Sequence, residues 1–375
     1  MKIVIAPDSY KGSVSARLAA ATMAEGVLRA LPDAEVVQCP MGDGGEGTLS
    51  ALVTCTGAEV RYAEVLDAYG ELRRAAWGWN PGTLTAYLEL AEACGLQCLD
   101  ISKHSILDST TYGVGQLVRE TLDAGARSLV LTLGGSATND AGAGMMVALG
   151  GRLLDRNGLE LPLGAGNLTK VDRVDLSGLD PRLEDLDVMA AVDVDNPLLG
   201  PNGASSIYGP QKGATAMDVK YLDDALETFA AKVASAAGAD YKDYPGAGAA
   251  GGMGYAAKAL FKATLKPGIQ VVMEQVGFER ALDGTDLVIT GEGRLDGQSL
   301  AGKTPLGISR VASKKGIPVV VIAGQLGDGW RASYQHGVTA AFSLTDGPMS
   351  LQEAVNNSSL LLADRCEAVA RLYSF

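Results

Sequence analysis

The first indication of the fold class is residues 1–20, MKIVIAPDSYKGSVSARLAA. Its apolar run at 2–6 ends at Pro7, which indicates a buried strand. Ser13 or Ser15 then caps a helix that we expect to run to about Leu31. A second strand is predicted at 35–39, followed by the glycine-rich segment 42–47 and another helix. Strands alternating with helices are typical of an α/β fold with a parallel sheet.

The C-terminal part of the chain repeats this pattern. Apolar runs at 286–290, 318–323 and 338–343 predict three parallel strands. A helix between the first two has Pro305 in its first turn and Gly316 after its end, as helix boundaries prefer. A last helix is predicted over 350–373. Since neither chain end alone has enough strands for a doubly wound sheet, we expect residues 1–58 and 284–375 to form one discontinuous Rossmann-like domain.

The middle of the chain, residues 59–283, is then a second α/β domain inserted into the first. It has a long amphipathic pattern from Met217 to Ala237, which predicts a helix. We expect the active site in the cleft between the two domains. The strands predicted in the inserted domain are 59–65, 72–79, 84–89, 128–133 and 187–192.

Charge and cysteine content exclude several classes of protein. The 375-residue chain has a formal net charge of −13, whereas nucleic-acid binding depends on basic residues that neutralise phosphates. No signal peptide or membrane-spanning run is visible, so a cytoplasmic protein is expected. The cysteines have neither a disulfide-scaffold nor a zinc-site spacing; they are Cys39, Cys55, Cys94, Cys98 and Cys366.

The segment LVLTLGGSATNDAGAG (129–144) is the strongest local signal of a binding site. An apolar run ends in two glycines, and a helix is expected to start near Asp140. Glycines allow close approach of the backbone to a ligand, and amides at a helix start bind anions. The alternative is a simple strand–turn–helix junction capped by Asn139 or Asp140. The candidate phosphate ligands are Gly134, Gly135, Ser136, Thr138 and Asn139.

Two segments match the dinucleotide pattern GxGxxG, at 42–47 and 246–251. The first follows a predicted strand, but it places Asp43 and Glu46 where a pyrophosphate would lie. Two carboxylates there would repel a pyrophosphate and are better suited to Mg²⁺ or to a neutral hydroxyl. The chain contains no Walker A sequence and no protein-kinase motif set.

Polar residues follow two predicted strands of the terminal domain. Asp8, Ser9 and Lys11 come after the first strand, at the sheet edge where open parallel sheets bind ligands. Glu292, Arg294 and Asp296 follow the strand at 286–290 and meet the same edge. Lys11 could hold a transferred phosphoryl group. The structural alternatives are a turn residue at Ser9, a solvated Lys11 and a surface ion pair in the second cluster.

Asp193 follows the apolar run at 187–192 and opens the segment DVDNPLLGPNGASSIYGPQKGA, residues 193–214. A carboxylate at the end of a strand can act as a general base for a hydroxyl. Alternatively, Asp195 and Asn196 before Pro197 form only a turn.

Taken together, these segments resemble the class I glycerate kinase family over nearly the whole chain. The resemblance is carried by eight motifs in order: APDSYKGSVSA, PMGDGGEGT, STTYGVGQLV, GGSATNDAGAGM, DVDNPLLGPNGASSIYGPQKGA, PGAGAAGGMG, DLVITGEGRLDGQ and GKTPLG. It implies transfer of the ATP γ-phosphoryl group to D-glycerate, usually giving 2-phosphoglycerate.

Within that reaction we assign roles to the candidate residues. Phosphoryl transfer needs positioning, neutralisation of charge and a base for the hydroxyl. We expect Asp193 to be the base, and Lys11 and Arg294 to neutralise the phosphoryl group and the substrate carboxylate. The loop at 134–139 would hold phosphate oxygens. Asp8, Ser9 and Glu292 would bind glycerate, and the candidate ligands for Mg²⁺ are Asp43, Glu46 and Asp296.

Three other interpretations remain open at this stage. They are a kinase for another small hydroxy acid, a dinucleotide-dependent oxidoreductase, and a non-catalytic sensor of a phosphorylated metabolite. The expected partners are glycerate and ATP, with neither nucleic acid nor membrane, and a homodimer is left open.

Overall fold

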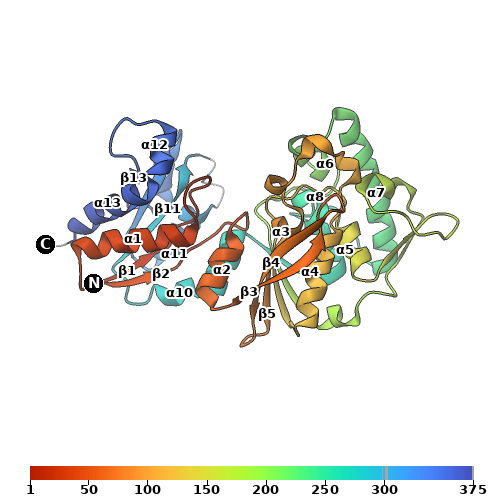
Figure 1. Ribbon diagram of the computed structural model, residues 1–375, viewed down its shortest axis with the longest axis horizontal. Coiled ribbons are helices and arrows are strands. Elements are labelled where there is room, and N and C mark those ends of the chain that lie inside the picture. Colours follow the sequence, from red (N-terminus) through yellow and green to blue (C-terminus); the bar gives the residue numbers. More distant parts are fainter. Residues whose placement is uncertain (298, 300–302, 374–375) are drawn as a thin grey trace. The chain divides into compact units, whose positions relative to one another are not determined.

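The computed structural model describes residues 1–297, 299 and 303–373, and the chain divides into two compact units (Figure 1). The first unit contains Met1–Asp43, Ser50–Gly57 and Ile269–Phe375. The second unit contains Gly44–Leu49 and Ala58–Gly268. Both ends of the chain therefore belong to the first unit.

The first unit is built on a five-stranded parallel sheet of order β13-β12-β11-β1-β2. Both ends of the chain supply strands to it, as predicted, and the α/β fold class is confirmed. The connections run in opposite directions from β1 and β11, so the strand order reverses between these two neighbours. The strands are β1 (Lys2–Ile5), β2 (Glu35–Gln38), β11 (Leu287–Leu295), β12 (Val319–Leu326) and β13 (Ala340–Ser343).

Helices cover this sheet, and α1 (Ala16–Ala30) packs along α13 (Ser358–Arg371) (Figure 1). Gly26 makes the close approach possible, because a Cβ there would overlap the carbonyl oxygen of Ala363. Of the two capping residues considered, Ser15 is the N-cap and accepts the Leu18 amide at 3.3 Å. The other helices of this unit are α2 (Thr48–Thr56, which begins in the second unit), α9 (Gly268–Val276), α10 (Phe278–Ala281), α11 (Thr304–Lys314) and α12 (Leu351–Asn356).

The second unit contains a six-stranded mixed sheet of order β10-β9-β6-β5-β4-β3. The strands from β10 to β5 run parallel, whereas β4 pairs antiparallel with both β5 and β3. The five predicted strands are confirmed: β3 (Glu59–Leu66), β4 (Leu72–Asn80), β5 (Thr85–Glu89), β6 (Ser128–Thr132) and β9 (Asp187–Ala191). The short strands β7 (Arg152–Leu154), β8 (Arg173–Asp175) and β10 (Thr264–Lys266) were not predicted.

The longest helix of the second unit, α7 (Ala216–Ala237), was predicted almost to its ends. Thr215 begins it with a capping box, in which its hydroxyl accepts the Asp218 amide and the Asp218 carboxylate accepts the Thr215 amide. The remaining helices are α3 (Leu90–Cys94), α4 (Tyr112–Asp123), α5 (Ala143–Ala148), α6 (Ala204–Tyr208) and α8 (Ala249–Phe261).

Two boundaries differ from the sequence-based expectation. The helix expected over 350–373 is broken at Asn357, whose side chain donates to the Glu353 carbonyl at 3.0 Å. The stretch 269–283 belongs to the first unit and not to the inserted segment 59–283. It packs there because Ile269 lies against Gly307 of α11 and Lys315 donates to the Glu279 carbonyl.

No helix in the described ranges is both long and apolar enough to cross a membrane.

Candidate functional site

A cavity of about 280 Å³ lies in the first unit at the point where the strand order reverses. The backbone brings its two halves together: the Ala6 amide bonds the Ile289 carbonyl and the Asp8 amide bonds the Gly291 carbonyl, each at 2.8 Å. Ligands of open α/β sheets bind at this kind of position. The lining residues are Asp8, Ser9, Lys11, Asp43, Glu292, Gly293, Arg294 and Lys303. Six sequence-predicted site residues are among them.

Asp8 is a buried carboxylate in this cavity. It accepts the Ser9 amide at 2.6 Å and the hydroxyl of Thr304, the first residue of α11, at 2.5 Å. Burial and the neighbouring charge of Asp43 raise the pKa of Asp8 to about 6. Ser9 lines the cavity and donates its amide to the neighbouring Asp8 carboxylate.

Glu292 is the second buried carboxylate, and it accepts the Ser299 hydroxyl at 2.8 Å. Burial raises the pKa of Glu292 to about 7, and the charges of Asp8 and Asp43 add to this rise. The pKa of Asp8 and the pKa of Glu292 are both raised, and positive charge in the cavity would stabilise the ionised form of both carboxylates. Lys11, Arg294 and Lys303 line the same cavity and supply part of it.

The three carboxylates predicted to hold Mg²⁺ are divided between the two units and differ in their contacts. Asp296 forms an ion pair with Arg294 at 2.8 Å, and Glu46 belongs to the second unit while Asp43 belongs to the first. Across the described ranges, no group of three or more acidic, cysteine or histidine side chains is arranged to hold a metal ion. Asp43 alone lines the cavity with Asp8 and Glu292.

In the second unit, the loop after β6 is more deeply buried than a phosphate-binding loop was expected to be. Gly135 is exposed and has a φ of +76°, and Ser136 is 5% exposed. Thr138 and Asn139 have no exposed area, and Asn139 donates to the Ser205 hydroxyl at 2.9 Å. The loop is therefore exposed at Gly135, whereas Thr138 and Asn139 form its buried interior.

Asp140 occupies the anion position at the start of the following helix. Its carboxylate accepts the amides of Thr111, Gly142 and Gly144 at 2.8, 3.1 and 3.0 Å, and the Thr111 hydroxyl at 3.0 Å. The helix α5 starts at Ala143, three residues later than expected. The N-cap of α5 is Gly142, so the expectation that Asn139 or Asp140 caps this helix is wrong. Because the Asp140 carboxylate already accepts the amides of Gly142 and Gly144, the helix start is not where a phosphate would bind.

Asp193 lies at the end of β9 and is exposed. Its Oδ1 accepts the amide of Gly268 at 2.7 Å. It therefore has a structural contact at the first residue of α9, and its predicted role as a base stays a prediction.

Two buried charged residues near these loops were not predicted. Glu89 accepts the Gly47 and Leu49 amides at 3.1 and 3.0 Å, and burial raises its pKa to about 7. Lys212, 2% exposed, donates to the Ser136 hydroxyl at 2.8 Å and to the Thr138 carbonyl at 2.7 Å. Lys212 lies in the motif at 193–214, but nothing in the sequence indicates that it is buried.

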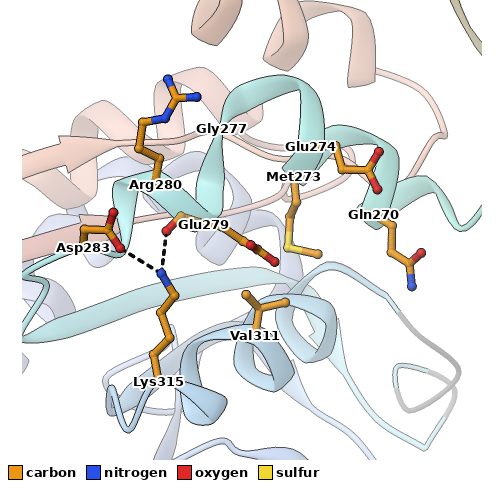
Figure 2. Close-up of a pocket in the computed structure, with 9 residues that line it drawn as sticks. All are labelled: Gln270, Met273, Glu274, Gly277, Glu279, Arg280, Asp283, Val311 and Lys315. Atoms are coloured by element: carbon orange, nitrogen blue, oxygen red, sulfur yellow. Dashed lines mark hydrogen bonds and ion pairs between the residues drawn. The ribbon is translucent and has the colours of Figure 1, made fainter.

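A second cavity, of about 810 Å³, lies elsewhere in the first unit, where α9 and α10 face α11 (Figure 2). Lys315 donates there to the Glu279 carbonyl and to the Asp283 carboxylate, each at 2.9 Å. Acidic, basic and apolar groups are mixed along its walls, and none of the predicted site residues lines it.

Comparison with known proteins gives full-length matches. The model of the glycerate kinase family matches residues 3–374. Glycerate 2-kinase of Escherichia coli is 46% identical over 94% of this chain and 93% of its own length. Glycerate kinase of Bacillus subtilis is 45% identical over 96% and 94%. A crystal structure assigned provisionally to glycerate kinase 2 of Salmonella typhimurium LT2 has a TM-score of 0.91 at 40% identity, covering 100% of this chain and 98% of that one.

With the cavity at the edge of a parallel sheet, these matches define an α/β enzyme of the kinase class. Its relatives share its length as well as its sequence. The chain belongs to the glycerate kinase family.

Proposed function

We propose that this enzyme transfers the γ-phosphoryl group of ATP to D-glycerate, at the 2-hydroxyl. The observation that carries the proposal is the match to the glycerate kinase family across residues 3–374. The Escherichia coli relative is named a glycerate 2-kinase, which supports the 2-hydroxyl as acceptor. ATP follows as the phosphoryl donor from membership of a kinase family.

The cavity of the first unit suits a small hydroxy acid in size and charge. Its volume of about 280 Å³ is large enough for a three-carbon molecule and a few waters. Lys11 and Arg294 would bind the glycerate carboxylate, for which a guanidinium provides two parallel donors. Asp8 and Glu292 would accept hydrogen bonds from the glycerate hydroxyls, with Ser9 beside them.

The second unit also has residues to which we assign a role in the proposed reaction. In the second unit, Gly134, Gly135 and Ser136 would hold phosphate oxygens, with Thr138 and Asn139 supporting the loop from within. Asp193 would accept the proton of the attacking hydroxyl. Lys11 would also neutralise charge on the transferred phosphoryl group, because phosphoryl transfer depends mainly on positioning and on charge neutralisation.

Hard carboxylate oxygens in this region fit Mg²⁺. The ion keeps several waters and commonly takes only one or two carboxylates together with the substrate phosphates, so a three-carboxylate cluster is not required. Among Asp43, Glu46 and Asp296, Asp43 has the strongest support, since its charge raises the pKa of both Asp8 and Glu292. Bound Mg²⁺ would neutralise phosphate charge during transfer.

The test is to incubate the enzyme with ATP, Mg²⁺ and D-glycerate, and to identify the product by phosphorus NMR. We expect 2-phosphoglycerate and stoichiometric ADP. Glycerol, which lacks the carboxylate, is the matched control and should react far more slowly. Equal rates with glycerol would contradict the substrate assignment, and 3-phosphoglycerate as product would contradict only the choice of hydroxyl.

A further inference from the structure

Lys212 is a buried cation without a carboxylate among its hydrogen-bond partners. Both of its acceptors are neutral, the Ser136 hydroxyl and the Thr138 carbonyl. Burial lowers the pKa of Lys212 to about 8, and the neighbouring titratable groups that oppose this shift are Asp140 and the Cys94 thiol. An ammonium held away from water by neutral groups is unfavourable for stability, so such a residue points to a functional demand.

The hydrogen bonds around Lys212 leave donors in excess. An ammonium group has three N–H donors, and within the described part of the chain two of them have acceptors. Ser136 accepts from Lys212, and its own hydroxyl proton has no acceptor in that part of the chain. A cation and a hydroxyl that both have a donor to spare are suited to an oxygen-rich anion.

The position of this pair in the loop indicates which anion. Ser136 follows the exposed Gly135, at the outer part of the loop after β6. Asp140 already occupies the amides at the start of α5, so positive charge for a ligand of this loop has to come from a side chain. Lys212 supplies this positive charge. It lies in the 3-10 turn Pro210–Lys212, which follows α6.

We propose that Lys212 and Ser136 together bind a phosphate group of the nucleotide, with Lys212 as a phosphate-binding residue of the second unit. This rests on the proposed kinase function and extends it with a residue that the sequence did not indicate. The Ser136 hydroxyl donates to a phosphate oxygen, while the ammonium of Lys212 polarises that hydroxyl and donates its third N–H to the same phosphate.

Substitution of Lys212 by methionine separates this role from that of a loop support. Methionine is similar in length and removes the buried charge, so the phosphate-binding role predicts equal or higher melting temperature together with weaker nucleotide binding. If Lys212 only supports the loop, the variant should have a lower melting temperature and unchanged nucleotide binding, because the Ser136 hydroxyl and the Thr138 carbonyl would lose their hydrogen-bond partner. The matched control is Lys258→Met, since Lys258 is half-buried and also donates to a carbonyl, that of Ala263 at 3.0 Å.

The experiment measures ADP and adenosine binding by calorimetry, with the melting temperature of each variant. For Lys212→Met we expect ADP affinity to fall about 10- to 100-fold, adenosine affinity to stay at the wild-type value, and the melting temperature not to fall. Ser136→Ala should weaken ADP binding by about tenfold, and Lys258→Met should leave it unchanged. ADP binding by the wild type should also weaken between pH 7 and pH 9, and that dependence should be absent in Lys212→Met.

Three results would overturn the proposal. They are wild-type ADP affinity in Lys212→Met, an equal loss of adenosine affinity, or a melting temperature well below that of Lys258→Met. Wild-type activity with glycerate is measured in parallel. If glycerate gives no ADP but Lys212→Met loses ADP affinity as expected, the proposed substrate fails and the phosphate-binding role of Lys212 stands.

Discussion

Replacement of Asp140 by alanine should lower the stability of the second unit through the loss of hydrogen bonds within the protein, and not through a change in substrate binding. The carboxylate accepts three backbone amides and one hydroxyl in a fully buried position. Each buried donor left without an acceptor costs about 1–3 kcal/mol, so four would cost at least about 4 kcal/mol. Removal of a buried negative charge offsets part of this. We therefore expect the free energy of unfolding to fall by about 3 kcal/mol.

Asparagine at the same position is the graded control. Oδ2 of Asp140 accepts three of the four hydrogen bonds and Oδ1 accepts only the Gly142 amide. An asparagine oxygen in place of Oδ2 can keep those three, while its NH₂ group would face the Gly142 amide. The expected loss is then about 1–2 kcal/mol, clearly less than for alanine.

The loss of stability of the second unit is measured by urea unfolding, with tryptophan fluorescence as the signal. Trp77 and Trp79 are buried on β4 of the second unit, whereas Trp330 belongs to the first. In a Trp330→Phe background the signal therefore reports on the second unit alone. A wild-type urea midpoint for Asp140→Ala, or an equal loss for alanine and asparagine, would contradict the stabilising role of the Asp140 hydrogen bonds.

Three further predictions follow from single residues. Asp193→Asn should lower kcat by about 10²–10⁴ while ATP affinity is kept, with the exposed Asp195→Asn as control; a near-normal kcat would leave Asp193 a structural role, to which its contact with the Gly268 amide contributes. Burial raises the pKa of Glu89 from 4.5 to about 7, so the folded state retains that proton longer than the unfolded state and loses stability as the pH rises through this range. The measurement is the free energy of unfolding of the wild type and of Glu89→Gln as a function of pH. The wild-type value should fall relative to that of the variant by up to about 3 kcal/mol between pH 5 and pH 8. A difference between the two proteins that does not change with pH would contradict the raised pKa of Glu89. Gly26→Ala should lower the melting temperature through a loss of about 1–3 kcal/mol, because its Cβ would overlap the Ala363 carbonyl of α13; an unchanged melting temperature would show that the two helices separate without strain.

The strands predicted most directly from the sequence are those that correspond to short, continuous apolar runs. The runs at 2–6, 286–290 and 318–323 form β1, β11 and β12, and consecutive residues of each strand are buried, as in parallel strands generally. The Thr215 cap and the amphipathic pattern after it placed α7. In each case local residues alone determined the element.

Features that depend on distant partners could not be read in this way. The burial of Lys212 depends on Ser136 and Thr138, more than 70 positions earlier in the chain. Asp140 looks like an ordinary helix-start residue until Thr111 is seen to donate to it. The membership of 269–283 in the first unit depends on contacts with α11, which lie beyond the reach of a sequence pattern.

The discontinuous first unit has a consequence for synthesis of the protein. Strand β1 lies between β2 and β11 and pairs with β11 through Ile5 and Ile289, so it cannot complete its sheet until the whole second unit has been made. At about 5–20 residues per second, β1 would wait roughly 15–60 s on the ribosome. During that time the apolar faces of β1 and α1 lack their final neighbours.

We expect Ala58–Gly268 to fold first, and the N-terminal segment to be the part of the nascent chain that chaperones protect. Because both chain ends lie in one unit, they can be joined in a circular permutant that removes this delay. A circular permutant that begins at residue 269 and joins the old ends would synthesise all five strands of the first sheet in succession. The wait for β11 would then disappear, and newly made protein should be less prone to aggregate.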